Sequence, residues 1–451
     1  MRDLAIIGAG PAGEAAAFKA AKLGASVTVM ERDLAGGECP FWACLPSKTL
    51  LDSARRRACG ADYPWKRASA RRDWMISREG TDYPSDAGHV GAFEAEGIQF
   101  VRGTGRLVAP GRVEVAVDGG KPVSIEARSV ILSAGSVPFI PPIEGLDGAG
   151  YWTSRDATST RELPSSLIVM GGGPIGVEMA QVFARFGSKV TVVEGNDRLL
   201  SRDHPQSSKA VADQIAEEGI DIRTGVTATA VDAGGPGRIV GLSDGTKVEA
   251  AQVLVAVGRR PADLRALGAE EAGATLDERG AATPDERLAI GDRVYVAGDA
   301  AGGLQFTHLA DYEGRMTATS AIGGGDGVVD LTAVPRVTFT DPEVGAVGST
   351  IEEARERGVD AFELTQDYAQ TSRGMTIEGS HGHVSIVVDR GRRTLAGAFA
   401  ACPGAGEFIH EAVLAMRARI PLDVLADTIG AYPTSARVLN NLFVEAADQL
   451  R

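Results

Sequence analysis

The chain has 451 residues, of which 57 are glycine and only four are cysteine, and it carries 60 acidic against 46 basic side chains. This length suits about three domains with large cores, and a hydrophobic content of 44% is typical of a globular protein, which excludes disordered and fibrous classes. The formal net charge of −14 argues against a nucleic-acid or anionic-membrane partner, and no apolar run approaches the roughly 20 residues of a membrane span.

The N-terminus and the cysteine count bear on the compartment. Residues 1–4 lead directly into an apolar strand and contain no signal-peptide cleavage region. Four cysteines in so long a chain cannot form a disulfide framework. We therefore expect a cytoplasmic protein.

A dinucleotide-binding pattern opens the chain. Leu4–Ile7 predicts a strand, the sequence GAGPAG a tight turn, the alanine-rich stretch to Leu23 a helix, and Ser26–Glu31 the next strand. In this setting the turn and the helix N-terminus bind a pyrophosphate, and Glu31, about 20 residues on, accepts from a ribose hydroxyl. The glycines expected to bind the cofactor in this turn are Gly8, Gly10 and Gly13.

The same pattern recurs about 160 residues later. Leu167–Met170 predicts a strand, GGGPIG a turn, Val177–Phe186 a helix, and Lys189–Glu194 the second strand, which ends in a carboxylate. The glycines of this turn expected to bind a cofactor are Gly171, Gly173 and Gly176. Two such units imply two dinucleotide sites in one chain, and a nicotinamide with a flavin is the economical pair because hydride passes between them.

Each unit is followed by a strand that ends in glycine, at Gly135 and at Gly258. A third strand, Val294–Val296, leads to a loop carboxylate, Asp299. The glycine-rich segment 323–327 predicts a linker. After it, alternating strands and helices predict a last domain.

Two of the cysteines form a C-x4-C pair, in the sequence GGECPFWACLPSK that follows Glu31. Two buried thiols are one interpretation of Cys39 and Cys44, because free cysteine is among the most buried residue types. Their position at the opening of a predicted helix beside a dinucleotide site favours a redox pair instead, since helix N-termini lower thiol pKa values. In an ideal helix the two would be too far apart for a disulfide, so bridging requires a distorted helix start.

In order along the chain, GAGPAG, GGECPFWACLPSK, GGGPIGVE, VGRRP, VYVAGDA, VPRVTFTDPEVGAVG and GAGEFIHEAV together resemble the class I pyridine nucleotide-disulfide oxidoreductases. That family includes dihydrolipoamide dehydrogenase, glutathione reductase and mercuric reductase. The resemblance implies an α/β fold with two Rossmann-like domains and a C-terminal α+β dimerisation domain, in a homodimer that binds FAD and NAD(P)H. The implied segments are an FAD domain (1–146), an NAD(P) domain (147–264), a central segment completing the FAD site (265–331) and an interface domain (332–451).

The resemblance also implies roles. Cys44 matches the thiol that forms a charge-transfer complex with the flavin, and Cys39 the interchange thiol that attacks substrate. Lys48 and Glu178 match an ion pair beside flavin N5, and Asp299 a carboxylate on the ribityl chain. The implied catalytic residues are Cys39, Cys44, Lys48, Glu178 and Tyr432. The implied cofactor-binding residues beyond the two turns are Glu31, Gly37, Lys48, Gly105, Gly135, Glu194, Gly258 and Asp299.

The nicotinamide is expected to be NADH, with NADPH as the alternative. Glu194 accepts from a ribose 2′-hydroxyl and repels a 2′-phosphate. The residues that follow lack the paired arginines of NADP-preferring relatives, although Arg198 and Arg202 could still bind a phosphate.

The resemblance fails near the C-terminus. Disulfide-reducing relatives carry a histidine there, with a glutamate five positions later, but Tyr432 and Arg437 occupy these positions. A tyrosine is ionised in only about one molecule per thousand at neutral pH, and losing a positioned base typically costs about 10² to 10⁴ in rate. We therefore do not expect efficient turnover of lipoamide or glutathione disulfide.

Other residues could compensate in part. His308 is expected to begin a helix near the flavin, where packing is a more common role for it than catalysis. His410 predicts dimer core, and the remaining histidines, in polar loop or strand-edge contexts, are His89, His204, His381 and His383. Phe41 and Trp42, between the cysteines, fit either packing or an aromatic wall for a flat substrate. Cys59 and Cys402 are expected to be structural.

Three functions follow from this sequence. The first is an FAD-dependent NAD(P)H oxidoreductase that passes hydride to the Cys39–Cys44 disulfide or to a quinone-like acceptor, a step that needs no thiol base. The second is a disulfide reductase or dithiol oxidase for an unusual thiol. The third is a non-catalytic, redox-responsive flavoprotein. The chain ends without the C-terminal cysteine pair of mercuric reductase, so metal-ion reduction and a metal site are not expected.

Overall fold

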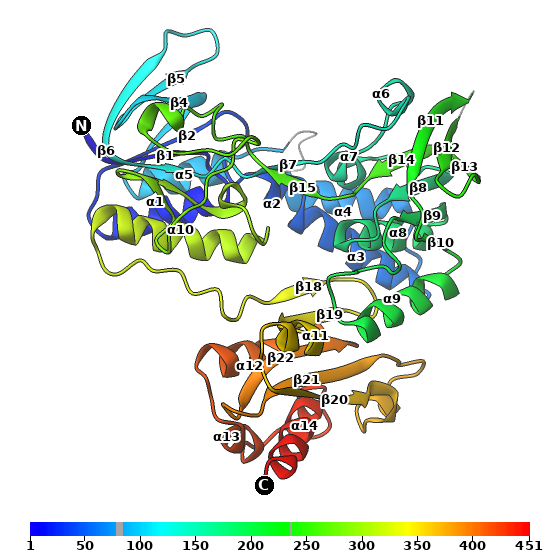
Figure 1. Ribbon diagram of the computed structural model, residues 1–451. Helices are drawn as coiled ribbons and strands as arrows, with labels where there is room; N and C mark the ends of the chain where they lie inside the picture. The colour runs from blue at the N-terminus through cyan, green and yellow to red at the C-terminus, as the bar shows by residue number, and fades with distance from the viewer. Residues whose placement is uncertain (78–83, 235–236) are drawn as a thin grey trace. The chain divides into compact units, whose positions relative to one another are not determined.

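The computed structural model describes residues 1–77, 84–234 and 237–451, and these form two compact units (Figure 1). Unit 1 comprises residues 1–46, 70–139 and 258–329, and unit 2 comprises residues 47–69, 140–257 and 330–451.

A mostly parallel sheet is the centre of unit 1. Its strands are β1 (Arg2–Ile7), β2 (Val27–Glu31), β3 (Gln99–Arg102), β4 (Thr104–Ala109), β5 (Arg112–Ala116), β6 (Val123–Leu132), β16 (Ala289–Gly291) and β17 (Val294–Val296). The order is β16-β17-β6-β1-β2-β3, with antiparallel β5 and β4 continuing from β6. Leu4 to Ile6 in β1 are fully buried, as expected for parallel strands covered on both faces.

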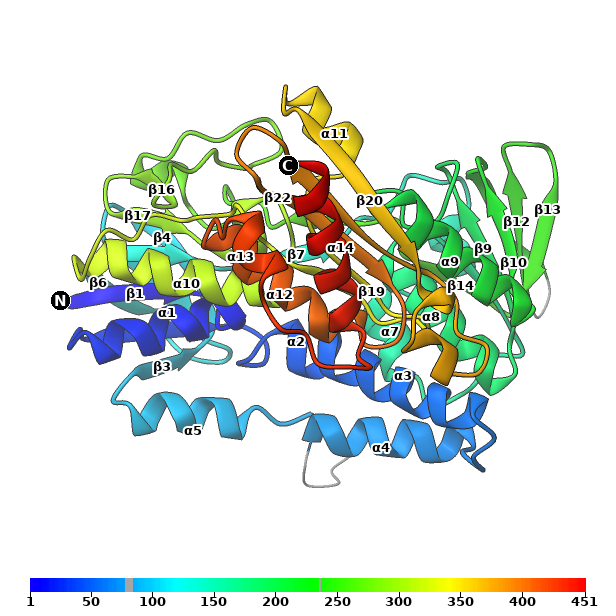
Figure 2. The ribbon, with the colours of Figure 1, turned by 90° about the horizontal axis from the view of Figure 1, so that it is seen from below.

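The helices of unit 1 are α1 (Pro11–Lys22), α2 (Glu38–Phe41), α5 (Ala87–Ala95) and α10 (Thr307–Ile322). Helices α1 and α10 lie side by side (Figure 2), and they are closest at Gly314, where an added Cβ would lie 2.1 Å from the carbonyl oxygen of Ala12. A short antiparallel pair, β7 (Ser136–Pro138) with β15 (Arg259–Pro261), completes the unit. Helices α3 (Cys44–Ala58) and α4 (Trp65–Ser77) each contain residues of both units.

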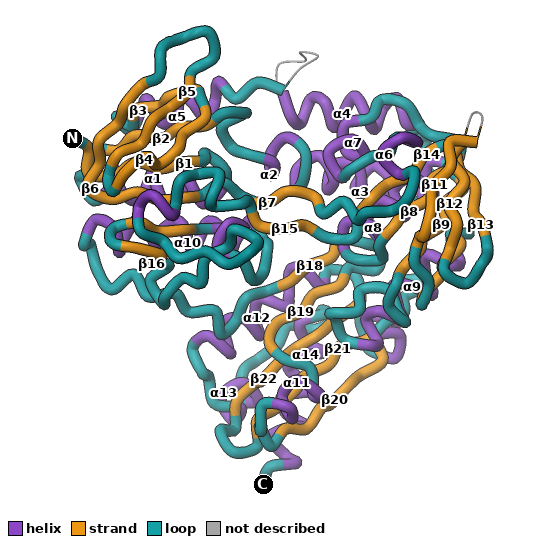
Figure 3. Tube along the Cα trace, turned by 45° about the horizontal axis from the view of Figure 1, so that its top comes forward, coloured by secondary structure: helices purple, strands orange, loops and turns teal. Residues whose placement is uncertain are grey.

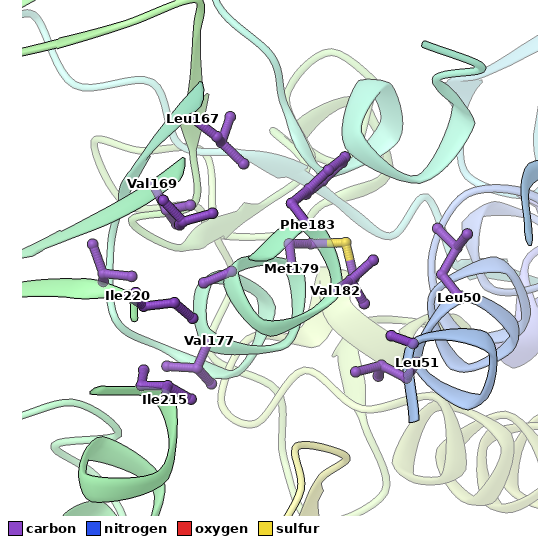
Figure 4. Close-up of a cluster of buried hydrophobic side chains, with 14 of the residues drawn as sticks. Leu50, Leu51, Leu167, Val169, Val177, Met179, Val182, Phe183, Ile215 and Ile220 are labelled. Carbon is purple, nitrogen blue, oxygen red and sulfur yellow. The ribbon is translucent and has the colours of Figure 1, made fainter. Parts of the chain in front are cut away.

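The first part of unit 2 repeats the strand–turn–helix–strand arrangement. Its parallel sheet has the order β10-β9-β8-β14, and a separate antiparallel sheet has the order β11-β12-β13. The elements are α6 (Leu146–Ala149), α7 (Ser154–Ser159), β8 (Ser166–Met170), α8 (Pro174–Phe186), β9 (Lys189–Glu194), α9 (Pro205–Glu217), β10 (Asp221–Thr224), β11 (Ala228–Gly234), β12 (Gly237–Leu242), β13 (Lys247–Ala250) and β14 (Gln252–Val255). Apolar side chains of α8, including Val177 and Phe183, pack among Leu50, Leu167 and Val169 (Figure 4).

The second part of unit 2 is an antiparallel sheet with helices, whose strands are drawn orange in Figure 3. The strand order is β18-β19-β22-β21-β20. The elements are β18 (Arg336–Thr338), β19 (Val344–Gly348), α11 (Ile351–Glu356), β20 (Ala361–Asp367), β21 (His383–Asp389), β22 (Thr394–Ala401), α12 (Ala405–Arg417), α13 (Leu422–Ala426) and α14 (Ala436–Gln449). No helix within the described ranges is both long and apolar enough to cross a membrane.

A buried histidine pair corrects the expectation that His204 and His383 occupy polar loop or strand-edge positions. Their rings stack with centroids 4.8 Å apart, and both side chains are almost fully buried. His204 caps α9 by accepting from the backbone N–H of Gln206, and its Nε2 lies 3.1 Å from Glu363. His383 bonds the hydroxyls of Ser207 and Ser385. The two histidines thus join α9 to the C-terminal sheet.

The buried histidine pair predicts that the free energy of unfolding decreases as the pH falls. Burial, with a smaller contribution from His204, lowers the pKa of His383 to about 3. Between about pH 6.5 and that value the unfolded chain binds a proton that the folded chain does not, so unfolding becomes easier by about 1.4 kcal/mol per pH unit as the pH falls. In chemical denaturation at pH 7.0 and 5.0, His383→Asn should lose less stability across this interval than the natural chain. An equal loss in both proteins would contradict the prediction.

Candidate functional site

The first glycine-rich turn is shaped by contacts that leave no room for side chains. Gly8 has φ +106°, and an added Cβ would lie 2.4 Å from the carbonyl oxygen of Ser133. A Cβ on Gly13 would lie 2.0 Å from the carbonyl oxygen of Gly8. Gly10 precedes α1, and no side chain caps the helix there. The first N–H groups of α1 therefore suit a pyrophosphate.

The second turn has the same construction. Gly171 also has φ +106°, with an added Cβ 2.4 Å from the carbonyl oxygen of Ala256, and a Cβ on Gly176 would lie 1.9 Å from the carbonyl oxygen of Gly171. Gly173 precedes α8, again with no capping side chain. In each unit the carboxylate that ends the second strand accepts from a backbone N–H of the turn, Glu31 from Ala9 at 2.8 Å and Glu194 from Gly172 at 2.6 Å.

Two further segments converge on the first turn. A Cβ on Gly37 would lie 2.8 Å from the Cα of Gly10, so the chain leading to the cysteines touches the turn. A Cβ on Gly298 would lie 2.9 Å from that of Ala12, which places the segment carrying Asp299 against the first residues of α1. Unit 1 thus gathers a glycine-rich turn, the Glu31 carboxylate and the segment carrying the Asp299 carboxylate at one place, a donor set that fits FAD.

The remaining predicted glycines have different surroundings. Gly105 lies in β4, and a Cβ there would be 2.8 Å from Cγ of Met30, so close packing within the core of unit 1 requires a glycine. Gly135 has φ +72° and precedes β7. Gly258 has φ +129° and belongs to unit 1, where its carbonyl accepts from Phe139 N–H at 2.9 Å. The glycines of the second turn belong to unit 2.

The cysteines lie on either side of a helix break. Cys39 is in the four-residue helix α2, Trp42 ends that helix, and Cys44 is the first residue of α3. A disulfide between two cysteines at this spacing would require a distorted helix start, and this interruption is such a distortion. Both residues are partly exposed free thiols.

Thr307 connects the two thiols, and sequence reasoning missed it. Its hydroxyl lies 3.3 Å from Sγ of Cys44 and also bonds Cys39. The thiol of Cys44, by its hydrogen bond to Cys39, is the largest cause that raises the pKa of Cys39, followed by burial and by the charge on Cys44. The only signal in the sequence was that Thr307 begins a helix next to His308.

This geometry favours Cys44 as the thiolate of the reduced pair. Cys44 lies at the N-terminus of α3, and its sulfur contacts the first residue of α10, so two helix dipoles stabilise negative charge there. The pKa of Cys39 is raised, first by its hydrogen bond with Cys44. The roles expected for the two cysteines stay a prediction.

The hydroxyl of Thr307 should matter for thiol reactivity. Thr307→Val removes the donor to Cys44 with little change in shape, so iodoacetamide should alkylate Cys44 in the dithiol form about three- to tenfold more slowly at pH 7. Thr307→Ser keeps the hydroxyl and serves as the matched control. Alkylation is followed by mass spectrometry of the peptide containing Cys44, because exposed Cys59 also reacts. Equal rates in the valine and serine variants would contradict the prediction.

Lys48 and Glu178 form the predicted ion pair in unit 2. Nζ of Lys48 lies 2.8 Å from Oε2 of Glu178, whose side chain is only 5% exposed. The other oxygen of Glu178 accepts from Phe339 N–H at 2.9 Å, and Nζ of Lys48 also lies over the Phe339 ring. The buried carboxylate is therefore fully paired, and it holds the lysine in one position.

The aromatic residues between the cysteines have separate roles. Phe41 is buried against the ring of His89 and beside Trp42, so it packs the core. Trp42 is partly exposed. His89 is paired with Glu14 at 2.7 Å, which raises its pKa, instead of lying in a polar loop. Of the remaining cysteines, Cys402 is buried as expected, whereas Cys59 is exposed just after α3 and has no packing role.

The C-terminal segment contains Tyr432 and Arg437, the residues that stand in place of the histidine and glutamate of disulfide-reducing relatives. Tyr432 is 74% exposed, and Arg437 donates to the carbonyl of Gly430 at 3.3 Å. His308 is exposed at the start of α10, with its ring stacked on Phe306. Among the described residues no three histidine, cysteine or acidic side chains are grouped so that they could hold a metal ion.

Comparison with known proteins decides the family. Residues 2–322 match the family model of the pyridine nucleotide-disulphide oxidoreductases, and residues 334–443 match the dimerisation domain of the same family. The chain belongs to this family. FAD and NAD(P)H are the family's cofactors, which confirms the expected cofactor classes, and the predicted α/β fold with a C-terminal dimerisation domain is confirmed as well.

The relatives fall into several named groups. A mercuric reductase of Streptomyces lividans is 35% identical over 97% of this chain and 94% of its own length. A dihydrolipoyl dehydrogenase of Bacillus subtilis is 30% identical, covering 97% of both chains. Among solved structures, the HOCl-induced flavoprotein disulfide reductase RclA from Escherichia coli has a TM-score of 0.87 at 29% identity, covering 98% of this chain and 99% of that one.

Proposed function

We propose that this protein is an NADH-dependent flavoenzyme that reduces its own Cys39–Cys44 disulfide and passes the electron pair to a small, quinone-like acceptor. The contact of Thr307 with Cys44 carries the proposal, because a hydroxyl 3.3 Å from the sulfur can donate to a thiolate there. FAD, when bound, supplies a carrier of two electrons between the nicotinamide and the thiols. We propose that the catalytic and cofactor-binding residues predicted from the sequence act together in this reaction.

The first half of the reaction involves only NADH and the Cys39–Cys44 disulfide. One hydride equivalent from NADH, which carries two electrons and one proton, breaks the S–S bond and leaves a thiol at Cys39 and a thiolate at Cys44. A quinone then takes the two electrons, the proton of the Cys39 thiol and one proton from solvent to become a quinol, and the S–S bond forms again. Neither half requires a histidine to remove a proton from an attacking substrate thiol.

The nicotinamide proposed is NADH. Both oxygens of Glu194 are held by the protein, one by Gly172 N–H and the other by the backbone and side-chain N–H groups of Asn196, so a carboxylate stays fixed at the end of β9. The guanidinium of Arg198 donates to the carbonyl oxygens of Ser201 and Asp203. It is therefore committed to its own loop instead of a 2′-phosphate.

This preference can be measured. The natural chain should show kcat/KM at least tenfold higher with NADH than with NADPH, because a fixed carboxylate repels the phosphate. Glu194→Gln should narrow the ratio by improving NADPH, whereas Arg198→Met should leave it within about threefold. A tenfold preference for NADPH in the natural chain would contradict the proposal.

The acceptor is tested by removing the thiols. Anaerobic NADH titration should bleach the flavin of the natural protein and give a long-wavelength band, which Cys44→Ser abolishes. If a menadione-type quinone takes its electrons from the thiols, Cys39→Ser should lower its turnover at least tenfold. Turnover unchanged by Cys39→Ser and Cys44→Ser would place quinone reduction at the flavin and overturn the thiol route. Failure of NADH to bleach the flavin would favour a non-catalytic flavoprotein.

A disulfide substrate is the second candidate, because the C-x4-C pair is intact and the structurally similar RclA is a flavoprotein disulfide reductase. Thiol-dependent NADH turnover that exceeds quinone turnover would support it.

We propose that the protein acts in the cytoplasm as a homodimer with the four segments predicted from the sequence, and that Tyr432 of one subunit faces the thiols of the other. Exposed apolar side chains of the C-terminal part support that interface: Leu414, Val424, Ile429, Tyr432 and Val444.

A further inference from the structure

An arginine outside the predicted site touches the residue that precedes Cys39. Glu38 is the first residue of α2, and its Oε2 lies 2.7 Å from Nη2 of Arg259. The arginine side chain is only 17% exposed. Because α2 has just four residues and ends at Trp42, this ion pair holds the first residue of the turn that carries Cys39.

The same guanidinium reaches toward a carboxylate of the proposed FAD site. Nε of Arg259 donates to Oγ of Ser136 at 2.8 Å, and Nη2 donates to the carbonyl oxygen of Ser136, also at 2.8 Å. The Ser136 hydroxyl in turn donates to Oδ2 of Asp299 at 2.5 Å. In the antiparallel pair of β7 with β15, Arg259 lies opposite Pro138 and Ser136 lies opposite Pro261, so the long arginine side chain reaches two residues along β7 to Ser136.

We propose that Arg259 is a positioning residue that anchors the thiol turn through Glu38 and the FAD-directed carboxylate Asp299 through Ser136. The inference rests on the proposed role of Asp299 toward FAD. Arginine suits this position because its planar fork donates in several fixed directions at once, whereas lysine offers a point charge. Without the arginine, Glu38 loses its ion pair with Arg259, and Ser136 loses the donor that orients its hydroxyl toward Asp299.

The network can be cut at each end separately. Glu38→Gln removes the charge at the thiol turn, Ser136→Ala removes the link to Asp299, and Arg259→Met removes both. Arg260→Met is the matched control, since Arg260 is the next residue and is exposed. Two measurements follow, neither of which needs turnover: the rate of FAD release, from flavin fluorescence after dilution, and amide hydrogen exchange of residues 38–44 in the flavin-free protein.

The expected pattern is specific. Ser136→Ala should speed FAD release about tenfold and leave exchange of residues 38–44 unchanged, whereas Glu38→Gln should do the reverse, with exchange at least threefold faster. Arg259→Met should show both effects, and Arg260→Met neither. Normal FAD retention in Arg259→Met, or unchanged exchange in Glu38→Gln, would overturn the proposal. Because both readouts are independent of NADH, a failure of the proposed electron transfer would appear separately, as a flavin that NADH does not bleach.

Discussion

The close approach of backbone to backbone at the two glycine-rich turns is the constraint on which the rest of this structure depends. At Gly13 and Gly176 an added Cβ would lie only 2.0 and 1.9 Å from a carbonyl oxygen, far inside van der Waals contact, so no side chain is tolerated. This contact lets the first turn of each following helix pack on its strand, with its N–H groups directed toward a ligand. The carboxylates at the ends of β2 and β9 are fixed by N–H groups of the same turns.

The thiol chemistry is built on this foundation in unit 1. Gly37 contacts Gly10, so the segment that carries Cys39 begins where the phosphate-binding turn lies. Because α2 ends at Trp42, α3 begins as a separate helix at Cys44, and the Cys44 side chain belongs to the first residue of that helix. Helix α10, which packs on α1 through Gly314, brings the Thr307 hydroxyl to the same sulfur. The packing of α10 on α1 at Gly314 therefore supports both the glycine-rich turn that precedes α1 and the position of the Thr307 hydroxyl at the Cys44 sulfur.

The elements with strong local signals were predictable from the sequence. Strand β9 has the predicted bounds, and both turns form where the glycine spacing placed them. The Lys48–Glu178 pair was expected from the family resemblance, and the structure brings the two side chains together. Thr307, Arg259 and the buried His204–His383 pair were not predictable in the same way, because each depends on partners far away in the chain. Nothing local distinguishes a buried histidine from a surface one.

The substitution of the C-terminal histidine has a consequence for the acceptor. In a thiol–disulfide exchange the substrate leaves as a thiolate that needs a proton, and a nearby imidazole supplies it efficiently. At neutral pH a phenol gives up a proton far less readily than an imidazolium does, so Tyr432 is a poorer acid–base group than a histidine. The described partner of Arg437 is the Gly430 carbonyl rather than a carboxylate. An acceptor such as a quinone takes its protons from solvent when its electrons arrive, so it avoids this cost. Two features remain that a flat two-electron acceptor can use: the contact of the Cys44 sulfur with the Thr307 hydroxyl, and a partly exposed Trp42 two residues earlier in the chain.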